Sequence, residues 1–252
     1  MLTSLSVACK RPPRCRPAAC VLLVCCLAAY SGCGSFSSQG LNAEGVRLFE
    51  QARIEDAMQQ FQRAVDHDPT NADGYYNLAA SYHRMGVMNH RASDLAQAER
   101  YYYLCLDRDP EHRESYRGLA VLLAEQNRSE EAFRLLQAWA DRRPNSPDPK
   151  IELARLYEEF GDRQRAKQQL SDALLADATN PRALAALGRI REQEGEQVQA
   201  LNNYQQSLWA NRFQPEVASR VTALQSSVGG IAAGTPTLGA SQTVSRGPSP
   251  LR

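Results

Sequence analysis

One small residue recurs along the chain with a nearly fixed period. Alanine occupies five positions spaced by 41, 34, 34 and 34 residues: Ala57, Ala98, Ala132, Ala166 and Ala200. Four residues after each alanine stands a large apolar residue: Phe61, Tyr102, Leu136, Leu170 and Tyr204. A second column of small residues precedes the first with the same period: Gly45, Ala79, Ala120, Ala154 and Gly188. A small residue lets two helix backbones approach closely, and a large residue one turn later fills the groove beside it. The columns therefore predict five stacked helix pairs.

The period and the residues in these columns resemble the tetratricopeptide repeat. The second unit shows the motif most fully, at Tyr75, Leu78, Ala79, Tyr82, Gly86, Ala98, Tyr102 and Pro110. The resemblance implies an all-α fold, a right-handed α-solenoid of about five helix pairs that covers residues 41–225. A further amphipathic segment with Val217, Val221 and Leu224 on one face is expected to form a C-terminal capping helix.

The ends of the helices and one insertion can also be placed. Gly86, Asn127, Gly161 and Gly195 are predicted to end the first helix of a pair in the left-handed conformation. The second unit is longer than its neighbours by seven residues, and both columns place the excess between Ala79 and Ala98. We expect the insertion to extend the turn at residues 87–93.

The first 32 residues have the order of a secretory signal. Four cations between Lys10 and Arg16 precede an uncharged run at residues 18–30, and small residues then lead to Cys33. As a helix this run would rise only about 20 Å, less than the ~30 Å hydrocarbon core of a bilayer. The junction AYSGC resembles the lipobox of bacterial lipoproteins, although Tyr30 stands where that family usually has Leu. The resemblance implies a signal peptide at residues 1–32 and a lipidated Cys33 that begins a tether at 33–40. An ordinary cleaved signal or an uncleaved anchor is the alternative interpretation.

The cysteine and charge counts argue against a disulfide-stabilised fold and against a nucleic-acid partner. Six of the seven cysteines lie in the first 33 residues, so cleavage before Cys33 would leave only Cys33 and Cys105 and no intramolecular disulfide. The same cleavage removes four cations and no acids, which leaves 25 basic against 28 acidic residues. That balance argues against nucleic acid as a partner. Residues 226–252 are rich in Gly, Ser, Thr and Pro and are predicted to form a disordered tail.

No catalytic motif stands out. The four histidines form no HExxH motif, and the chain has no GxSxG nucleophile turn and no glycine-rich phosphate loop. We therefore predict neither an enzyme nor a cofactor or metal site. One cluster supports an alternative: His83, Met85, Met88 and His90 are crowded near the insertion. Imidazole and thioether ligands suit Cu(I), so a metal or small-ligand carrier using residues 83–90 is the second hypothesis.

The tetratricopeptide resemblance assigns partner binding to the groove lined by the first helix of each pair. The residues at the groove positions are Asn42, Val46, Phe49, Tyr76, Asn77, Ala80, His83, Arg84, Arg117, Val121, Ile151, Arg155, Glu158 and Arg189. The arginines could bind carboxylates of an extended or helical peptide. The chaperone-binding subclass of the family grips a terminal carboxylate with Lys, Asn and Arg, and of the corresponding positions here Asn77 alone agrees. A cytosolic Hsp70 or Hsp90 co-chaperone is not expected.

These observations predict a non-enzymatic scaffold lipoprotein of the bacterial cell envelope. It would bind a protein or peptide in its groove and a membrane through lipid on Cys33, facing the periplasm. It resembles the tetratricopeptide lipoproteins that assist pilus or secretion assembly or tether cell-wall enzymes. Gly34 after Cys33 favours the outer membrane under the proteobacterial sorting rule. A cytosolic adaptor, with a start codon assigned too early, is the remaining alternative.

Overall fold

The computed structural model describes residues 37–233, which contain eleven α-helices and no strand. The helices are α2 (Ser38–Glu50), α3 (Ile54–His67), α4 (Ala72–Asn89), α5 (Ala92–Arg108), α6 (Arg113–Glu125), α7 (Ser129–Arg142), α8 (Pro147–Glu159), α9 (Arg163–Ala176), α10 (Pro181–Gln193), α11 (Gln197–Ala210) and α12 (Pro215–Ala233). The predicted all-α solenoid is confirmed. The predicted signal peptide, Cys33 and the tail beyond residue 233 lie outside the described residues.

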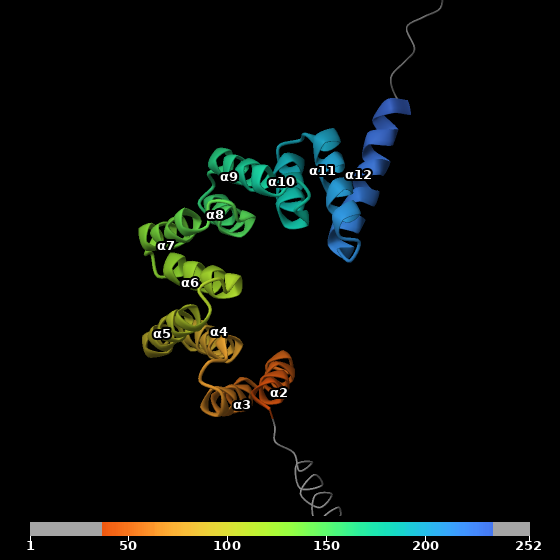
Figure 1. Ribbon diagram of the computed structural model, residues 1–252. Coiled ribbons are helices and arrows are strands. Elements are labelled where there is room, and N and C mark those ends of the chain that lie inside the picture. The colour runs from red at the N-terminus through yellow and green to blue at the C-terminus, as the bar shows by residue number, and fades with distance from the viewer. Residues whose placement is uncertain (1–36, 234–252) are drawn as a thin grey trace, which may run out of the picture.

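The helices pack in consecutive pairs, from α2 with α3 to α10 with α11. The first helices of neighbouring pairs, α2, α4, α6, α8 and α10, also contact one another along the chain. Figure 1 shows the result, an arc whose inner side is formed by these first helices and whose outer side is formed by their partners. The inner side of this arc is the concave face.

The periodic alanines lie where two helices touch. Every member of the alanine column has no exposed surface, and the large residues four positions later are at most 3% exposed. A Cβ atom placed on Gly45 would lie 2.4 Å from the ring of Phe61, and one on Gly188 would lie 2.9 Å from the ring of Tyr204. The large residue of the second helix thus packs directly on the small residue of the first, as the two columns predict.

Three of the four predicted helix ends are confirmed. Asn127, Gly161 and Gly195 have φ angles of 61°, 78° and 83°, in the left-handed region. The prediction for Gly86 is wrong, because α4 continues through it and His90 takes the left-handed conformation with φ 52°. The glycine serves close packing instead: a Cβ atom there would lie 2.5 Å from Leu95 Cδ2.

The insertion lengthens the two helices of the second pair and not the turn between them, so the predicted extended turn is also wrong. Helix α4 has 18 residues, against 13 in α2, α6, α8 and α10, and α5 has 17, against 14 in α3, α7, α9 and α11. Each helix of the second pair is longer by about one turn. Because an α-helix has about 3.6 residues per turn, such a lengthening keeps the apolar faces of both helices in register.

The last helix closes the stack. Val217, Val221 and Leu224 of α12 pack against Ala200 and Tyr204 of α11, which confirms the predicted capping contact. The helical region begins at Ser38 and ends at Ala233, so it extends past both ends of the predicted 41–225 range. Among the helices of residues 37–233, none has both the length and the hydropathy needed to cross a membrane.

Candidate partner-binding surface

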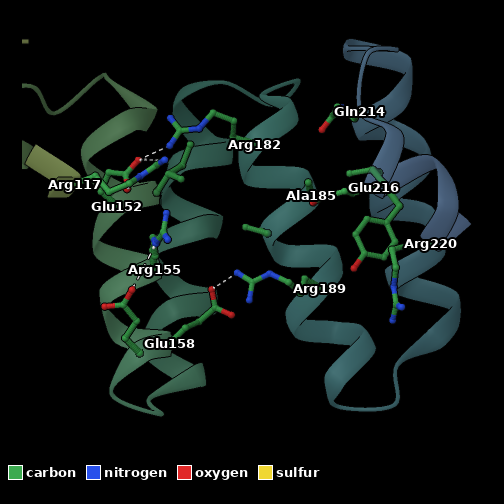
Figure 2. Close-up of a pocket in the computed structure, with 15 residues that line it drawn as sticks. Arg117, Glu152, Arg155, Glu158, Arg182, Ala185, Arg189, Gln214, Glu216 and Arg220 are labelled. Atoms are coloured by element: carbon green, nitrogen blue, oxygen red, sulfur yellow. Dashed lines mark hydrogen bonds and ion pairs between the residues drawn. The ribbon is translucent and has the colours of Figure 1, made fainter. Parts of the chain in front are cut away.

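Two hollows open on the concave side of the arc. The C-terminal hollow has a volume of about 610 Å³ and lies between the first helices of the last three repeats and α12. Figure 2 shows this hollow, with side chains of α8 and α10 on one side and of α12 on the other. The N-terminal hollow has a volume of about 590 Å³ and is lined by α2, α4, the loop before α4 and the start of α6. The two differ in chemistry, and each is built from a few identifiable contacts.

A buried carboxylate organises one rim of the C-terminal hollow. Arg117 of α6 donates to both oxygens of Glu152 of α8, from Nε at 3.0 Å and from Nη2 at 2.9 Å. Arg182 of α10 also donates to Glu152, and its Nη1 donates to Asp148 at 2.6 Å. The side chain of Glu152 is only 2% exposed. One carboxylate therefore joins the first helices of three successive repeats.

The pKa of Glu152 reflects these partners. Burial by itself raises the pKa of this carboxyl, but the hydrogen bonds and charges of Arg117 and Arg182 outweigh burial and hold the pKa below its usual range. The hydrogen bond to Glu152 correspondingly raises the pKa of the Arg117 guanidinium. The carboxylate is thus ionised at neutral pH although it is almost fully enclosed.

The remaining arginines of this hollow are held less tightly. Arg189 Nη2 donates to Glu158 Oε2 at 2.7 Å, while the Arg189 side chain stays 50% exposed. Arg155 Nε lies 3.6 Å from Glu159 Oε1, longer than a normal hydrogen bond, and its side chain is 48% exposed. Figure 2 shows Arg155 between the rim that holds Glu152 and the pair of Glu158 and Arg189. Arg155 is the cation of this hollow that a bound carboxylate could reach at the lowest cost.

Helix α12 supplies the opposite wall. Arg220 donates to both oxygens of Glu192, with 3.1 Å from its Nε, and the Tyr204 hydroxyl donates to the same carboxylate at 2.9 Å. Burial and the bond to Glu192 raise the pKa of Tyr204. Glu216 and Val217 also line this wall. The capping helix is therefore part of the candidate site as well as the end of the stack.

The N-terminal hollow contains carboxylates and amides, and no Lys or Arg lines it. Asn77 Nδ2 donates to Asn42 Oδ1 at 3.1 Å, which joins α4 to α2. His112 is 8% exposed and caps α6, since the Ser115 N–H donates to its Nδ1 at 3.1 Å. Its other nitrogen, Nε2, lies 3.2 Å from Asp73 Oδ1, and its ring contacts that of Tyr76 at a tilt of 36°, with centroids 5.1 Å apart.

The structure separates the residues predicted from the groove positions into groups. Arg117, Ile151, Arg155, Glu158 and Arg189 line the C-terminal hollow. Asn42, Val46, Tyr76 and Asn77 line the N-terminal hollow. Val121 lies in a small crevice beside Arg117 and Arg155. Phe49, Ala80, His83 and Arg84 line neither hollow, and the Arg84 guanidinium instead stacks 5.1 Å from the centroid of the Phe49 ring.

The expected role of one arginine needs correction. Arg117 was predicted to bind a partner carboxylate, but Glu152 occupies both arms of its guanidinium. Reasoning from the sequence missed Glu152 and the wall formed by Gln214, Glu216 and Arg220. A signal for Glu152 was present, because it stands in the repeat position of Asn77 and Gly118, where a charged residue in a tightly packed column requires a partner.

The segment proposed for a metal or small-ligand carrier is part of α4 and its C-cap. His83 Nε2 lies 2.8 Å from Glu125 Oε2 and its Nδ1 lies 3.4 Å from the Tyr102 hydroxyl, so both ring nitrogens have protein partners. His90 is the exposed residue at the helix end. Within residues 37–233 no group of three or more His, Cys, Asp or Glu side chains is placed to hold a metal ion.

Comparisons with known families fit this geometry. A sequence model described as TPR repeat matches residues 45–86, and one described as tetratricopeptide repeat matches 90–148 and 130–190. The chain belongs to the tetratricopeptide repeat family. Proteins of this family bind peptides or proteins in a groove and are generally non-enzymatic. A search of curated proteins found no match.

Solved structures with similarity to this chain include the following three. TTC0263, a thermophilic TPR protein of Thermus thermophilus, is 22% identical, with a TM-score of 0.55 over 75% of this chain and 98% of its own. PilF of Pseudomonas aeruginosa is 16% identical, with a TM-score of 0.48 over 79% and 93%. YrrB, described as a TPR protein with an unusual peptide-binding site, is 16% identical, with a TM-score of 0.39 over 73% and 90%. TTC0263 supports the fold alone.

Proposed function

We propose that this tetratricopeptide protein is a non-enzymatic scaffold whose C-terminal hollow binds a peptide segment of a partner protein. The observation that carries the proposal is Arg155, a half-exposed guanidinium whose ion pair with Glu159 is long. An incoming carboxylate can form a bidentate pair with Arg155 without breaking a strong internal bond. Every other arginine that lines this hollow has an internal carboxylate within normal hydrogen-bond distance.

The lining of the hollow also defines the partner. Ala185, Ala186 and Val217 form an apolar surface between the charged groups. Glu159 and Glu216 would accept a cation of the partner once Arg155 has turned to a carboxylate. A short segment with an acidic residue, small apolar residues and a basic residue fits this order, and such a segment could bind either extended or as a helix.

Site-specific photo-crosslinking in the native host tests the site. A benzoylphenylalanine at Ala185 is expected to capture a partner protein, and the same residue at exposed Arg134 on α7 serves as the control. Introducing Arg155→Glu beside the probe should reduce the captured product at least tenfold. Equal capture from both probe positions, or no effect of Arg155→Glu, would count against the hollow as the binding site.

We further propose that the scaffold is a lipoprotein of the bacterial envelope that faces the periplasm, with the outer membrane favoured. The support comes from the sequence: basic residues, a short apolar run and the junction AYSGC. Helix α2 begins at Ser38. Because the five residues from Cys33 to Ser37 span at most about 18 Å even when extended, lipid on Cys33 would hold the first repeat close to the membrane. Two or three acyl chains would anchor it firmly.

Mass spectrometry of the native amino terminus separates this proposal from the cytosolic alternative. We expect a mature chain that begins with a diacylglyceryl Cys33, and we expect Cys33→Ala to abolish both the modification and the membrane association. An unmodified terminus before residue 33 in the soluble fraction would favour the cytosolic adaptor. This result would leave the groove proposal intact, because crosslinking at residue 185 tests it separately.

A further inference from the structure

The N-terminal hollow contains a buried amide whose donor group has no acceptor. Asn42 of α2 is 9% exposed and lines this hollow. Its Oδ1 accepts from Asn77 Nδ2 at 3.1 Å, whereas its Nδ2 donates to no atom of residues 37–233. This Nδ2 is not fully enclosed, so a molecule in the hollow can reach it. An unpaired donor in so buried a residue costs free energy, which a ligand that accepts from it would recover.

Asn77 of α4 offers the complementary group. Its Nδ2 is used by Asn42, but its Oδ1 accepts from no donor among the described residues. The two bonded amides therefore present one donor and one acceptor to the hollow that both residues line. An extended peptide has unpaired backbone N–H and C=O groups, whereas a helix uses most of its own internally. The asparagine pair thus favours an extended peptide as the ligand.

Two aspartates of the same hollow each keep one carboxylate oxygen free. Asp73 is 75% exposed, and its Oδ1 lies 3.2 Å from His112 Nε2. Asp68 Oδ1 accepts from the hydroxyl of Thr70 at 2.6 Å and from its N–H at 3.0 Å. No hydrogen bond or ion pair within residues 37–233 uses either Oδ2 atom. The bonds from Thr70 lower the pKa of Asp68, so this carboxylate is ionised at neutral pH. Each aspartate is held by one oxygen and presents the other to a cation.

We infer that the N-terminal hollow is a second binding site, which takes an extended peptide segment with an Arg or Lys side chain. The cation pairs with Asp68 or Asp73, and a peptide group of the same segment bonds to Asn42 and Asn77. The hollow has a volume of about 590 Å³, within the range of ~300–1,000 Å³ that is typical of ligand sites. It shares no lining residue with the C-terminal hollow, so the inference does not depend on the function proposed above.

The same groups argue against other kinds of ligand. The phosphates of a lipid surface or a nucleic acid would be repelled by Asp68, Asp73 and Glu114, because no Lys or Arg lines the hollow. A polyamine or a metal ion would satisfy the carboxylates but offers no acceptor for Asn42 Nδ2. A basic peptide supplies both the cation and the carbonyl oxygen.

Nuclear magnetic resonance of the isotope-labelled protein tests the inference, because the side-chain amides of Asn42 and Asn77 report on contact. We expect the peptide acetyl-Ala-Arg-Ala-Arg-Ala-amide to shift both signals, with a Kd of roughly 1 mM or below. The matched peptide with citrulline in place of arginine keeps the shape without the charge and should bind at least tenfold more weakly. Spermidine, which has the charge without a carbonyl, should leave the Asn42 signal in place. An arginine peptide that causes no saturable shift, or that binds no better than the citrulline peptide, overturns the inference. An equal shift with spermidine would identify a simple cation site instead.

Matched variants locate the site of the arginine peptide. Asp73→Asn should weaken its binding at least tenfold, since a charge-assisted bond is lost. Asp107→Asn is the control, because Asp107 is 70% exposed, much like Asp73, but lines neither hollow. It should bind like the wild type, and equal weakening by both variants would mean that net charge, and not the hollow, attracts the peptide. Arg155→Glu should leave this binding unchanged, whereas it abolishes the crosslink that tests the C-terminal hollow. A loss of peptide binding in Arg155→Glu would place the peptide in that other hollow and overturn the inference.

Discussion

The two hollows have similar volumes and the same helical framework, yet they are held together by different interactions. The C-terminal hollow has five arginines and four glutamates in its lining, and a buried carboxylate connects three repeats across it. The N-terminal hollow has three carboxylates and no Lys or Arg, and amides and an imidazole make its contacts between repeats. The repeat period fixes the backbone of both hollows, whereas the residues at a few groove positions decide stiffness and charge separately in each.

The difference implies a division of roles. Ion pairs between successive repeats fix the C-terminal hollow as a preformed site, in which Arg155 remains available. The N-terminal hollow has an excess of negative charge, which attracts the basic part of a partner and raises the rate of encounter. The following predictions test this contrast.

Removal of the buried carboxylate should have the largest effect. Glu152→Ala removes the carboxylate that binds both arms of Arg117 and leaves Arg182 with Asp148 as its ion-pair partner. Breaking a buried pair costs about 3–5 kcal/mol, and the lower end applies because both arginines are partly exposed. We expect the free energy of unfolding in urea to fall by about 3 kcal/mol.

Glu159→Ala is the matched control for that variant. Its carboxylate is 41% exposed and makes a long contact with Arg155, so its loss should change the stability by less than about 0.5 kcal/mol. Equal losses for Glu152→Ala and Glu159→Ala would mean that burial of the carboxylate does not hold the three repeats together.

The pH dependence of stability should reveal the same carboxylate. Because Arg117 and Arg182 hold the folded-state pKa of Glu152 below that of the unfolded chain, its contribution is complete above the unfolded pKa. The contribution is lost as the pH falls through the depressed folded-state pKa. In Glu152→Gln the free energy of unfolding should therefore fall less steeply with pH below about pH 5.

Glu114 of the N-terminal hollow gives the comparison. Burial raises its pKa, but hydrogen bonds and charge, chiefly from Arg113, outweigh burial and lower the pKa overall. The contribution of Glu114 to stability is therefore also lost as the pH falls, as for Glu152. The Glu114 side chain is 40% exposed, and Glu114→Gln should flatten the pH profile less than Glu152→Gln. Urea titrations at several pH values measure both, and the reverse order would contradict the proposed contrast.

Much of the fold could be predicted because close packing leaves few options. Only a small residue fits where Ala132 touches the neighbouring helix, and this requirement recurs with each repeat. Asn127 and Gly161 indicated helix ends because such residues favour positive φ. Gly86 misled the same reasoning, since a glycine can serve a close approach as well as a left-handed turn. Spacing alone also could not distinguish a seven-residue loop from two added helical turns.

The site was less predictable, for a physical reason. Groove positions follow from the repeat, and Arg155 and Arg189 at two of these positions line the C-terminal hollow. Whether an arginine is available to a partner depends on residues one repeat away. Arg117 is not available, because Glu152 of the next repeat already binds its guanidinium. The wall with Arg220 could not be predicted, because the packing of α12 against the stack does not follow from the 34-residue period.

Loss of the histidine cap in the N-terminal hollow should have an intermediate effect. His112→Ala removes the acceptor for the Ser115 N–H and the contact between the His112 and Tyr76 rings. Losing an N-cap costs about 0.5–2 kcal/mol, so we expect a loss near 1.5 kcal/mol in urea unfolding. His112→Asn, which can still accept at the N-cap, should recover part of it. No recovery by Asn would show that packing of the ring, and not capping, is what α6 requires.

The smallest loss of stability is expected from neutralising Asp73 in the N-terminal hollow. This small loss contrasts with the large one expected from removing Glu152 in the C-terminal hollow. The Asp73 side chain is 75% exposed although it contacts His112, so Asp73→Asn should change the free energy of unfolding by less than about 0.5 kcal/mol. The Asp73 carboxylate is then free to serve an incoming cation, as the Glu152 carboxylate is not. A loss above about 1 kcal/mol would mean that Asp73 and His112 act as a structural pair. The N-terminal hollow would then depend on charge for its stability as the C-terminal hollow does, and the proposed division between a rigid site and an attracting one would fail.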